Sequence, residues 1–311
     1  MITIKKRQHY VWRNYLRAWA DKKDHIWALK KDEGKILRPE LMGVAQEKYF
    51  YRVHELTEPE IDFMRRFINE KTPKIVRDFC FDLLNSYIIP VKLKSIIASK
   101  GIVGKDIDEI VRSTEINMFE DIHCIFEGFG EKILQCKSIE DLQSMEDEDW
   151  DAALTFMMFQ YMRTKNMRTS IVAGFNEDSV QWGTLADKVW PLMSAIQAIT
   201  MGRNLSIGTT IKFKLLDNKT TCLFLTTDQP IINYVGDISD DEGYAKALEL
   251  YYPLSPRIAL YIHFKAEQSE KIIVEDISEE QVEQYNRKMI DNSHMWVFSD
   301  TQKQLESYLA I

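Results

Sequence analysis

The sequence predicts an α+β fold in which strands from both chain ends form one mixed or antiparallel sheet, with a large helical block inserted between them. Strand-like alternation and turn residues occupy residues 25–51 and 209–264, whereas apolar residues recur at helical spacing from Thr57 to about residue 203. We therefore expect a sheet-containing domain of residues 1–56 and 204–311, a helical insertion of residues 57–203, and β-pairing between the two strand-like regions.

The first 55 residues are expected to form a short helix followed by strands. Residues 25–29 have a strand-like pattern and lead into a turn at Gly34, since glycine accepts a positive φ at little cost. The helical block is expected to begin at Thr57, because Thr57 and Glu60 have the spacing of a capping box and a proline lies in the first turn.

Two prolines mark expected irregularities within the helical block. The helical pattern is interrupted near Pro90, and Pro191 is expected to bend a long helix whose apolar stripe starts at Trp182. Beyond Gly208 the strand-like alternation returns. The expected C-terminal elements are strands at residues 211–215, 221–227, 257–264, 271–274 and 294–298 and helices at residues 278–292 and 301–310.

The charge distribution bears on the class of partner. A net charge of −8 argues against general coating of nucleic acid, but residues 1–31 hold nine Lys and Arg against two Asp. This basic start is either a surface that meets phosphate or a solvated face of the protein. Nucleic acid, nucleotide and protein partners therefore all stay open.

Cysteine usage and hydropathy indicate a compartment. The four cysteines are isolated and have apolar neighbours, so we expect reduced core residues in a cytoplasmic protein. The N-terminus lacks the apolar segment of a secretory signal, and no run approaches the ~18 apolar residues of a membrane span. A membrane partner is not expected.

One segment, residues 154–164, is apolar almost all round, which is typical of a buried helix. Gln160 and Arg163 stand out in it and share one face because they are three residues apart. A buried arginine needs a partner, since an unpaired buried charge is costly. Arg163 is therefore either a structural residue or an anion-binding group with Gln160 beside it, and Asp228 is the first expected carboxylate partner.

Asp228 is the most prominent carboxylate of the chain, because it follows the apolar run 221–227 and precedes Pro230. It is either an acid, base or metal-binding group on a rigid loop or a cap that accepts backbone N–H bonds. If it is catalytic, Asp228→Ala is expected to abolish activity without unfolding the protein. His9, between basic and aromatic residues, is either a general base or phosphate contact or a structural histidine.

Metal-binding and nucleotide-binding signatures are sparse. Glu120 and His123 match one half of a di-iron helix pair, but no second copy exists, so no metal ligand is assigned. The nucleophile-elbow, zinc-protease, phosphate-loop and dinucleotide motifs are missing from the sequence. The cofactor stays undefined, with a divalent metal as one option.

The pieces His9-Tyr10-Val11, Gln160 to Thr164, Thr227 to Pro230, Pro253 to Pro256 and Asn286, in this order, resemble the largely bacterial protein family of unknown function DUF4238. This chain has Trp12 where the family pattern usually has proline. The resemblance implies an association with anti-phage defence and one site for its recurring residues, which are His9, Gln160, Arg163, Asp228, Ser255 and Asn286.

Two functions follow as hypotheses. The first is a defence effector that acts as a nuclease-like hydrolase on nucleic acid or nucleotide, with His9, Asp228 and Arg163 as catalytic residues. Its expected ligand-binding residues are Arg13, Tyr15, Gln160, Gln229, Ser255 and Asn286. The alternative is a non-enzymatic sensor or partner-binding module whose polar residues are structural. A solvent-reachable cavity favours the first hypothesis, and a sealed, fully hydrogen-bonded cluster favours the second.

Overall fold

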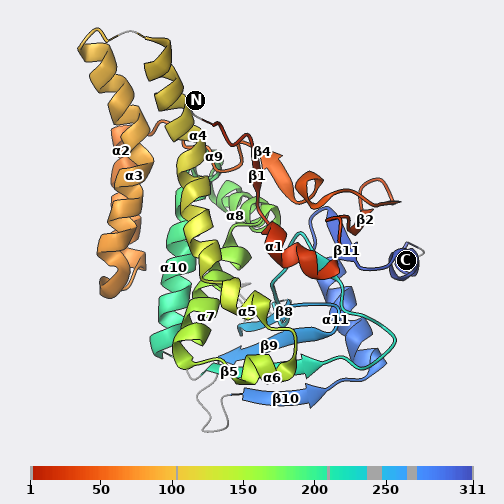
Figure 1. Ribbon diagram of the computed structural model, residues 1–311. Helices are drawn as coiled ribbons and strands as arrows, with labels where there is room; N and C mark the ends of the chain where they lie inside the picture. Colours follow the sequence, from red (N-terminus) through yellow and green to blue (C-terminus); the bar gives the residue numbers. More distant parts are fainter. Residues whose placement is uncertain (1–2, 103, 209–210, 237–246, 265–271, 310–311) are drawn as a thin grey trace.

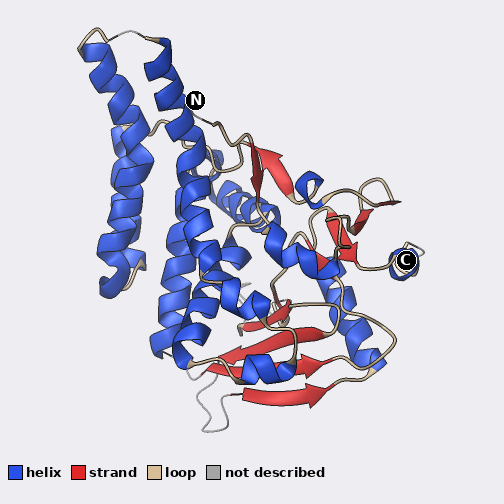
Figure 2. Cartoon of the chain, viewed as in Figure 1, coloured by secondary structure: helices blue, strands red, loops and turns tan. Residues whose placement is uncertain are grey.

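The computed structural model describes residues 3–102, 104–208, 211–236, 247–264 and 272–309. It confirms the α+β class and the large helical block between N-terminal and C-terminal strands (Figures 1 and 2). The block consists of α2 (Glu58–Lys71), α3 (Lys74–Ser99), α4 (Lys105–Gly128), α5 (Glu131–Gln135), α6 (Ile139–Gln143), α7 (Asp147–Met162), α8 (Lys165–Asp178), α9 (Val180–Lys188) and α10 (Trp190–Gly208).

The strands are distributed over three sheets, whereas one sheet was expected. The first pairs β1 (Arg7–His9) with β4 (Gln46–Lys48). The second has the order β3-β2-β11-β6, formed by β3 (Lys35–Leu37), β2 (Trp27–Lys30), β11 (Trp296–Ser299) and β6 (Thr226–Thr227). The third has the order β10-β5-β9-β8-β7, formed by β10 (Ile272–Asp276), β5 (Ile211–Asp217), β9 (Ile258–Phe264), β8 (Glu249–Pro253) and β7 (Ile232–Asn233).

The four-stranded sheet joins the two ends of the chain. Strand β2 pairs antiparallel with β11, which places Ala28 opposite Phe298, and β11 pairs in turn with β6. The two strand-like regions thus share a sheet, but β11 lies between them. The five-stranded sheet is mixed. Strand β10 runs parallel to β5, whereas the pairs β5–β9, β9–β8 and β8–β7 are antiparallel.

The expected strand at residues 221–227 is mostly irregular, and only Thr226 and Thr227 pair. Side chains satisfy its backbone instead. Asn218 donates to the Cys222 carbonyl, and Asn286 accepts from the Leu225 N–H. A segment whose polar groups are bonded in this way needs no neighbouring strand.

Neither proline has the effect expected from the sequence, which was an interruption at Pro90 and a bend at Pro191. Pro90 lies inside the continuous helix α3, where its ring is buried. Pro191 is the second residue of α10, a position at which its missing N–H costs nothing, while α9 ends at Lys188. By contrast, the start of the block is confirmed, since the Thr57 N–H donates to the Glu60 carboxylate at 2.7 Å.

The remaining elements follow the sequence expectations closely. Short helical turns α1 (Arg13–Leu16), η1 (Arg17–Trp19) and η2 (Leu41–Gly43) lie among the first strands, and α11 (Glu279–Asp291) and α12 (Gln302–Glu306) flank β11. Gly34 has the expected positive φ of 60°. Residues 209, 210, 237–246, 271 and 310, which lie in expected strands, loops or helices, fall outside the described residues.

A single large apolar core connects the N-terminal segment, the helical block and the five-stranded sheet. Helix α7 contributes residues from almost its whole circumference, including Trp150 and Phe156, and therefore confirms the expected buried helix. All four cysteines are free; Cys80 is buried as expected, whereas Cys124 is exposed. None of the helices in the described part of the chain combines the length and the apolar composition needed to cross a membrane.

Candidate functional site

Arg163 lies at the C-terminal end of α7, and only 2% of it is exposed. This confirms the expected burial, but its carboxylate partner is Glu127 and not Asp228. Arg163 Nη1 lies 2.8 Å from Glu127 Oε1, and Nη2 donates to Gln160 Oε1 at 3.0 Å. The last turn of α4 supplies Glu127 because α4 packs along α7.

Gln160 connects this arginine to the N-terminal segment. Its Nε2 donates to the Tyr10 carbonyl at 3.0 Å, and its Oε1 accepts from the Trp12 N–H at 3.3 Å. One buried amide thus holds residues 10–12 in place and bonds the Arg163 guanidinium. The family resemblance implied one site for six residues. The structure brings three of them together here, His9, Gln160 and Arg163. The other three, Asp228, Ser255 and Asn286, have other partners.

Further ionisable groups surround Arg163. The rings of Tyr51 and His123 are 4.2 Å apart, and burial, followed by the charge of Arg163, holds the pKa of His123 well below its usual value. Burial raises the pKa of Glu120 to about 7, against the opposing effect of Arg163. Within the described part of the chain, both His123 nitrogens and Glu120 Oε2 have no hydrogen-bond partner.

His9 completes this group from β1. Burial first, and then the nearby Arg13, lower the pKa of His9 to about 4, and Arg163 acts in the same direction. Its Nε2 also lacks a partner among the described residues. We call this set the Arg163 cluster, and its members are His9, Tyr51, Glu120, His123, Glu127, Gln160 and Arg163.

Asp228 lies outside the Arg163 cluster and is fully buried. Its carboxylate accepts three backbone N–H bonds, from His294 at 2.9 Å, Met295 at 2.8 Å and Trp296 at 3.1 Å. Burial raises its pKa, and the three N–H donors only partly offset this. The geometry is that of a cap which fixes the entry into β11, the second of the two interpretations of this residue.

Tyr15 and Gln229 hold the loop around Asp228 from two sides. The Tyr15 hydroxyl donates to the Pro253 carbonyl at 2.8 Å and lies 2.6 Å from the Thr226 hydroxyl. The Gln229 amide donates to the Ile231 carbonyl at 2.7 Å, and its oxygen accepts from the Thr164 hydroxyl. Through Thr164, this loop is joined to the end of α7.

The last three expected residues, Asn286, Ser255 and Arg13, lie outside the Arg163 cluster. Asn286 bonds the backbone of the irregular 222–225 segment through both its amide oxygen and its nitrogen. Ser255 accepts from the Arg257 and Ile258 N–H groups and so forms a turn. Arg13 contacts the sulfur of Met42. We call Tyr15, Asp228, Gln229 and Asn286 the loop-fixing residues.

A cleft of about 390 Å³ lies beside the Arg163 cluster, between α1 and α5. The N-terminal motif contributes Trp12, whose ring packs edge-on against that of Phe156 with 5.5 Å between the ring centroids. No sequence pattern indicated the residues that α5 brings to this cleft. Its lining consists of Trp12, Asn14, Tyr15, Arg17, Ala18, Glu131, Leu134, Gln135, Lys137 and Leu254.

Metal-ligand geometry is missing from the described residues. No group of three or more His, Cys, Asp or Glu side chains there is arranged to hold a metal ion. Glu120 and His123 do approach the same cluster, but they act there as neighbours of a cation, Arg163, whose charge repels a metal.

Fold and site together define an α+β protein in which an N-terminal motif, the end of a buried helix and an irregular loop are joined by buried polar side chains. The chain belongs to the protein family of unknown function DUF4238, whose family model matches residues 7–190 and 191–303. The resemblance drawn from the short motifs is thereby confirmed. No curated protein and no solved structure matches the chain.

Proposed function

We propose that this protein is a sensor that binds a nucleotide in the cleft between α1 and α5. The lining of that cleft carries the proposal. Trp12 supplies an aromatic face for a base, and two exposed cations supply positive charge for phosphate: Lys137, and Arg17, which also pairs with Asp24 at the surface. The amides of Asn14 and Gln135 suit the polar edges of a base, and the volume falls in the range of small-molecule sites.

The connection from the cleft to the Arg163 cluster supports a sensing role. Trp12 lines the cleft with its side chain, and its backbone N–H bonds Gln160, which in turn bonds Arg163. A ligand that displaces Trp12 therefore changes the hydrogen bonds of a buried cation. A binding event at the surface is coupled in this way to the packing of α7 against α4.

Binding is favoured over hydrolysis because the residues expected to be catalytic are absent from the cleft lining. Asp228 is sealed from solvent and holds three backbone N–H groups. Arg163 is buried and ion-paired with Glu127. Neither group is free to meet a phosphate without rearrangement.

A hydrolase acting on nucleotide or nucleic acid is the second candidate, and the Arg163 cluster favours it. Unpartnered buried polar atoms and strongly shifted pKa values are concentrated at active sites. His9, with a pKa of about 4, and Glu120, with a pKa of about 7, are a base and an acid in usable states at neutral pH. A defence role, implied by the family resemblance, is compatible with either candidate.

The binding proposal is tested with the double variant Arg17→Ala, Lys137→Ala. Both side chains are on the surface, so the fold is expected to persist. Nucleoside mono-, di- and triphosphates and a short single-stranded oligonucleotide are titrated by calorimetry. We expect the double variant to weaken nucleotide binding at least about tenfold, the loss expected for two phosphate contacts.

The matched control is Lys22→Ala, Lys23→Ala, which removes two exposed cations of the same segment outside the cleft lining. Equal losses in both double variants would indicate non-specific charge attraction and refute the site. Product formation from the same nucleotides, abolished by Glu120→Gln, would establish the hydrolase instead. Phage plating on cells that express each variant at matched levels tests the defence role.

A further inference from the structure

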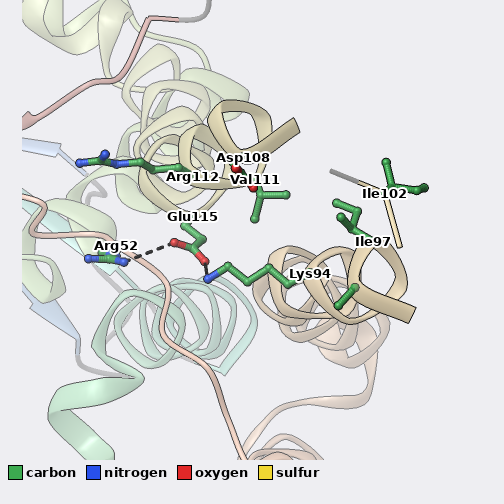
Figure 3. Close-up of a pocket in the computed structure, with 9 residues that line it drawn as sticks. Arg52, Lys94, Ile97, Ile102, Asp108, Val111, Arg112 and Glu115 are labelled. Carbon is green, nitrogen blue, oxygen red and sulfur yellow. Dashed lines mark hydrogen bonds and ion pairs between the residues drawn. The ribbon is translucent and has the colours of Figure 1, made fainter. Parts of the chain in front are cut away.

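A second pocket, of about 590 Å³, lies between helices α3 and α4 (Figure 3). At one end of it, the Glu115 carboxylate on α4 lies between two cations. Arg52 Nη2 is 3.3 Å from Glu115 Oε2, and Lys94 Nζ on α3 contacts Oε1. Figure 3 shows both cations directed at this one carboxylate.

These three charges are unequally exposed. The side chains of Arg52 and Lys94 are 45% and 53% exposed, whereas that of Glu115 is only 7% exposed. A molecule that enters the pocket therefore meets the cations first, with the carboxylate beneath them. Arg112 and Asp108 also line the pocket, so its charged side chains carry one positive charge in excess.

The other end of the pocket is apolar. Ile97 on α3, Ile102 after that helix and Val111 on α4 line it, and Figure 3 places the two isoleucines away from Arg52. Ile102 is 43% exposed, although burying such an apolar side chain is favourable. The pocket thus has a cationic end and an apolar end on opposite sides.

We propose that this pocket binds an aliphatic carboxylate, with its anionic head on Arg52 and Lys94 and its alkyl chain along Ile97, Ile102 and Val111. The two ends of such a ligand match the two ends of the pocket. One negative charge balances the single excess positive charge, whereas a phosphate dianion exceeds it. The site is independent of the nucleotide cleft and shares no lining residue with it.

The test is calorimetric titration of the full-length protein with octanoate below its micelle concentration. Octanol, octyl phosphate and octyltrimethylammonium are titrated alongside. We expect octanoate to bind at least about tenfold more tightly than octanol, because a charge-assisted contact is lost in the alcohol. Equal binding of octanol refutes the cationic end, and tighter binding of octyl phosphate refutes the carboxylate assignment.

Two variants locate the site. Lys94→Met keeps the aliphatic stem and removes the charge, and Ile102→Ser changes an exposed side chain at the apolar end, so both are expected to fold. Each is expected to weaken octanoate binding about tenfold. The control Lys92→Met removes an exposed cation of α3 outside the pocket lining. Unchanged affinity in both site variants, or equal loss in the control, overturns the proposal.

Discussion

The loop-fixing residues and the Arg163 cluster are both buried and polar, but they differ in how completely their groups are bonded. Each oxygen of Asp228 accepts at least one backbone N–H. In the Arg163 cluster, by contrast, atoms of His9, Glu120, His123 and Arg163 have no partner among the described residues. Saturated hydrogen bonding stabilises a fold, whereas an unsaturated buried cluster costs free energy and is retained where it serves another purpose. We therefore interpret the loop-fixing residues as structural and the Arg163 cluster as a candidate for catalysis or for a conformational change.

The largest effect is expected for Asp228→Ala. Three buried N–H groups lose their acceptor, so the free energy of unfolding should fall by about 4 kcal/mol, more than the ~1 kcal/mol of a single lost cap. Urea denaturation measures the change. Asp228→Asn keeps one carbonyl oxygen and should lose less. A variant with wild-type stability would contradict the structural interpretation of this residue.

A smaller loss, of about 3 kcal/mol, is expected for Arg163→Met. The volume is kept, but Glu127 and the Gln160 oxygen lose their cationic partner. Because Glu127 is 16% exposed, water replaces part of this interaction. The double variant Arg163→Met, Glu127→Gln should recover stability in a double-mutant cycle. Strictly additive losses would show that the two side chains do not interact.

The smallest effect is a change in pH dependence caused by Glu120→Gln. The folded-state pKa of Glu120 is raised from its usual 4.5 to about 7, so the folded protein holds this proton more tightly than the unfolded chain. Its contribution to stability is therefore present below pH 4.5 and is lost as the pH rises to about 7. The variant should lack that loss when unfolding is followed across this window.

His9 changes stability in the opposite direction and serves as the internal comparison. Its folded-state pKa is lowered from 6.5 to about 4, so the stability that it contributes is lost as the pH falls through that range. The difference between wild type and Glu120→Gln isolates the carboxyl group from this opposing titration. A difference that does not vary with pH would mean that Glu120 is solvated.

Local sequence was sufficient where a property depends on neighbouring residues. The capping box at Thr57, the turn at Gly34 and the burial of Arg163 were all predicted from residues within a few positions. The partner of Arg163 was not, because Glu127 is brought to it by packing of α4 against α7.

The cleft was missed for the same reason, since Lys137 and Gln135 have no local signature that connects them to Trp12. The irregular 222–225 segment has strand-like residues, and a local hydrogen bond from Asn218 together with a tertiary one to Asn286 overrode that tendency.

Because β2 pairs with β11, the four-stranded sheet cannot form until the residues of β11 have been synthesised. Lys30 can pair with Trp296 only after the intervening residues 31–295 have been made. At ribosomal rates of about 5 to 20 residues per second, this takes roughly 15 to 60 s. Until then the edge of β2 that β11 covers presents unpaired N–H and C=O groups, the kind of edge that recruits other chains. A polypeptide that stops before β11 is therefore an aggregation hazard even though its helical block is complete.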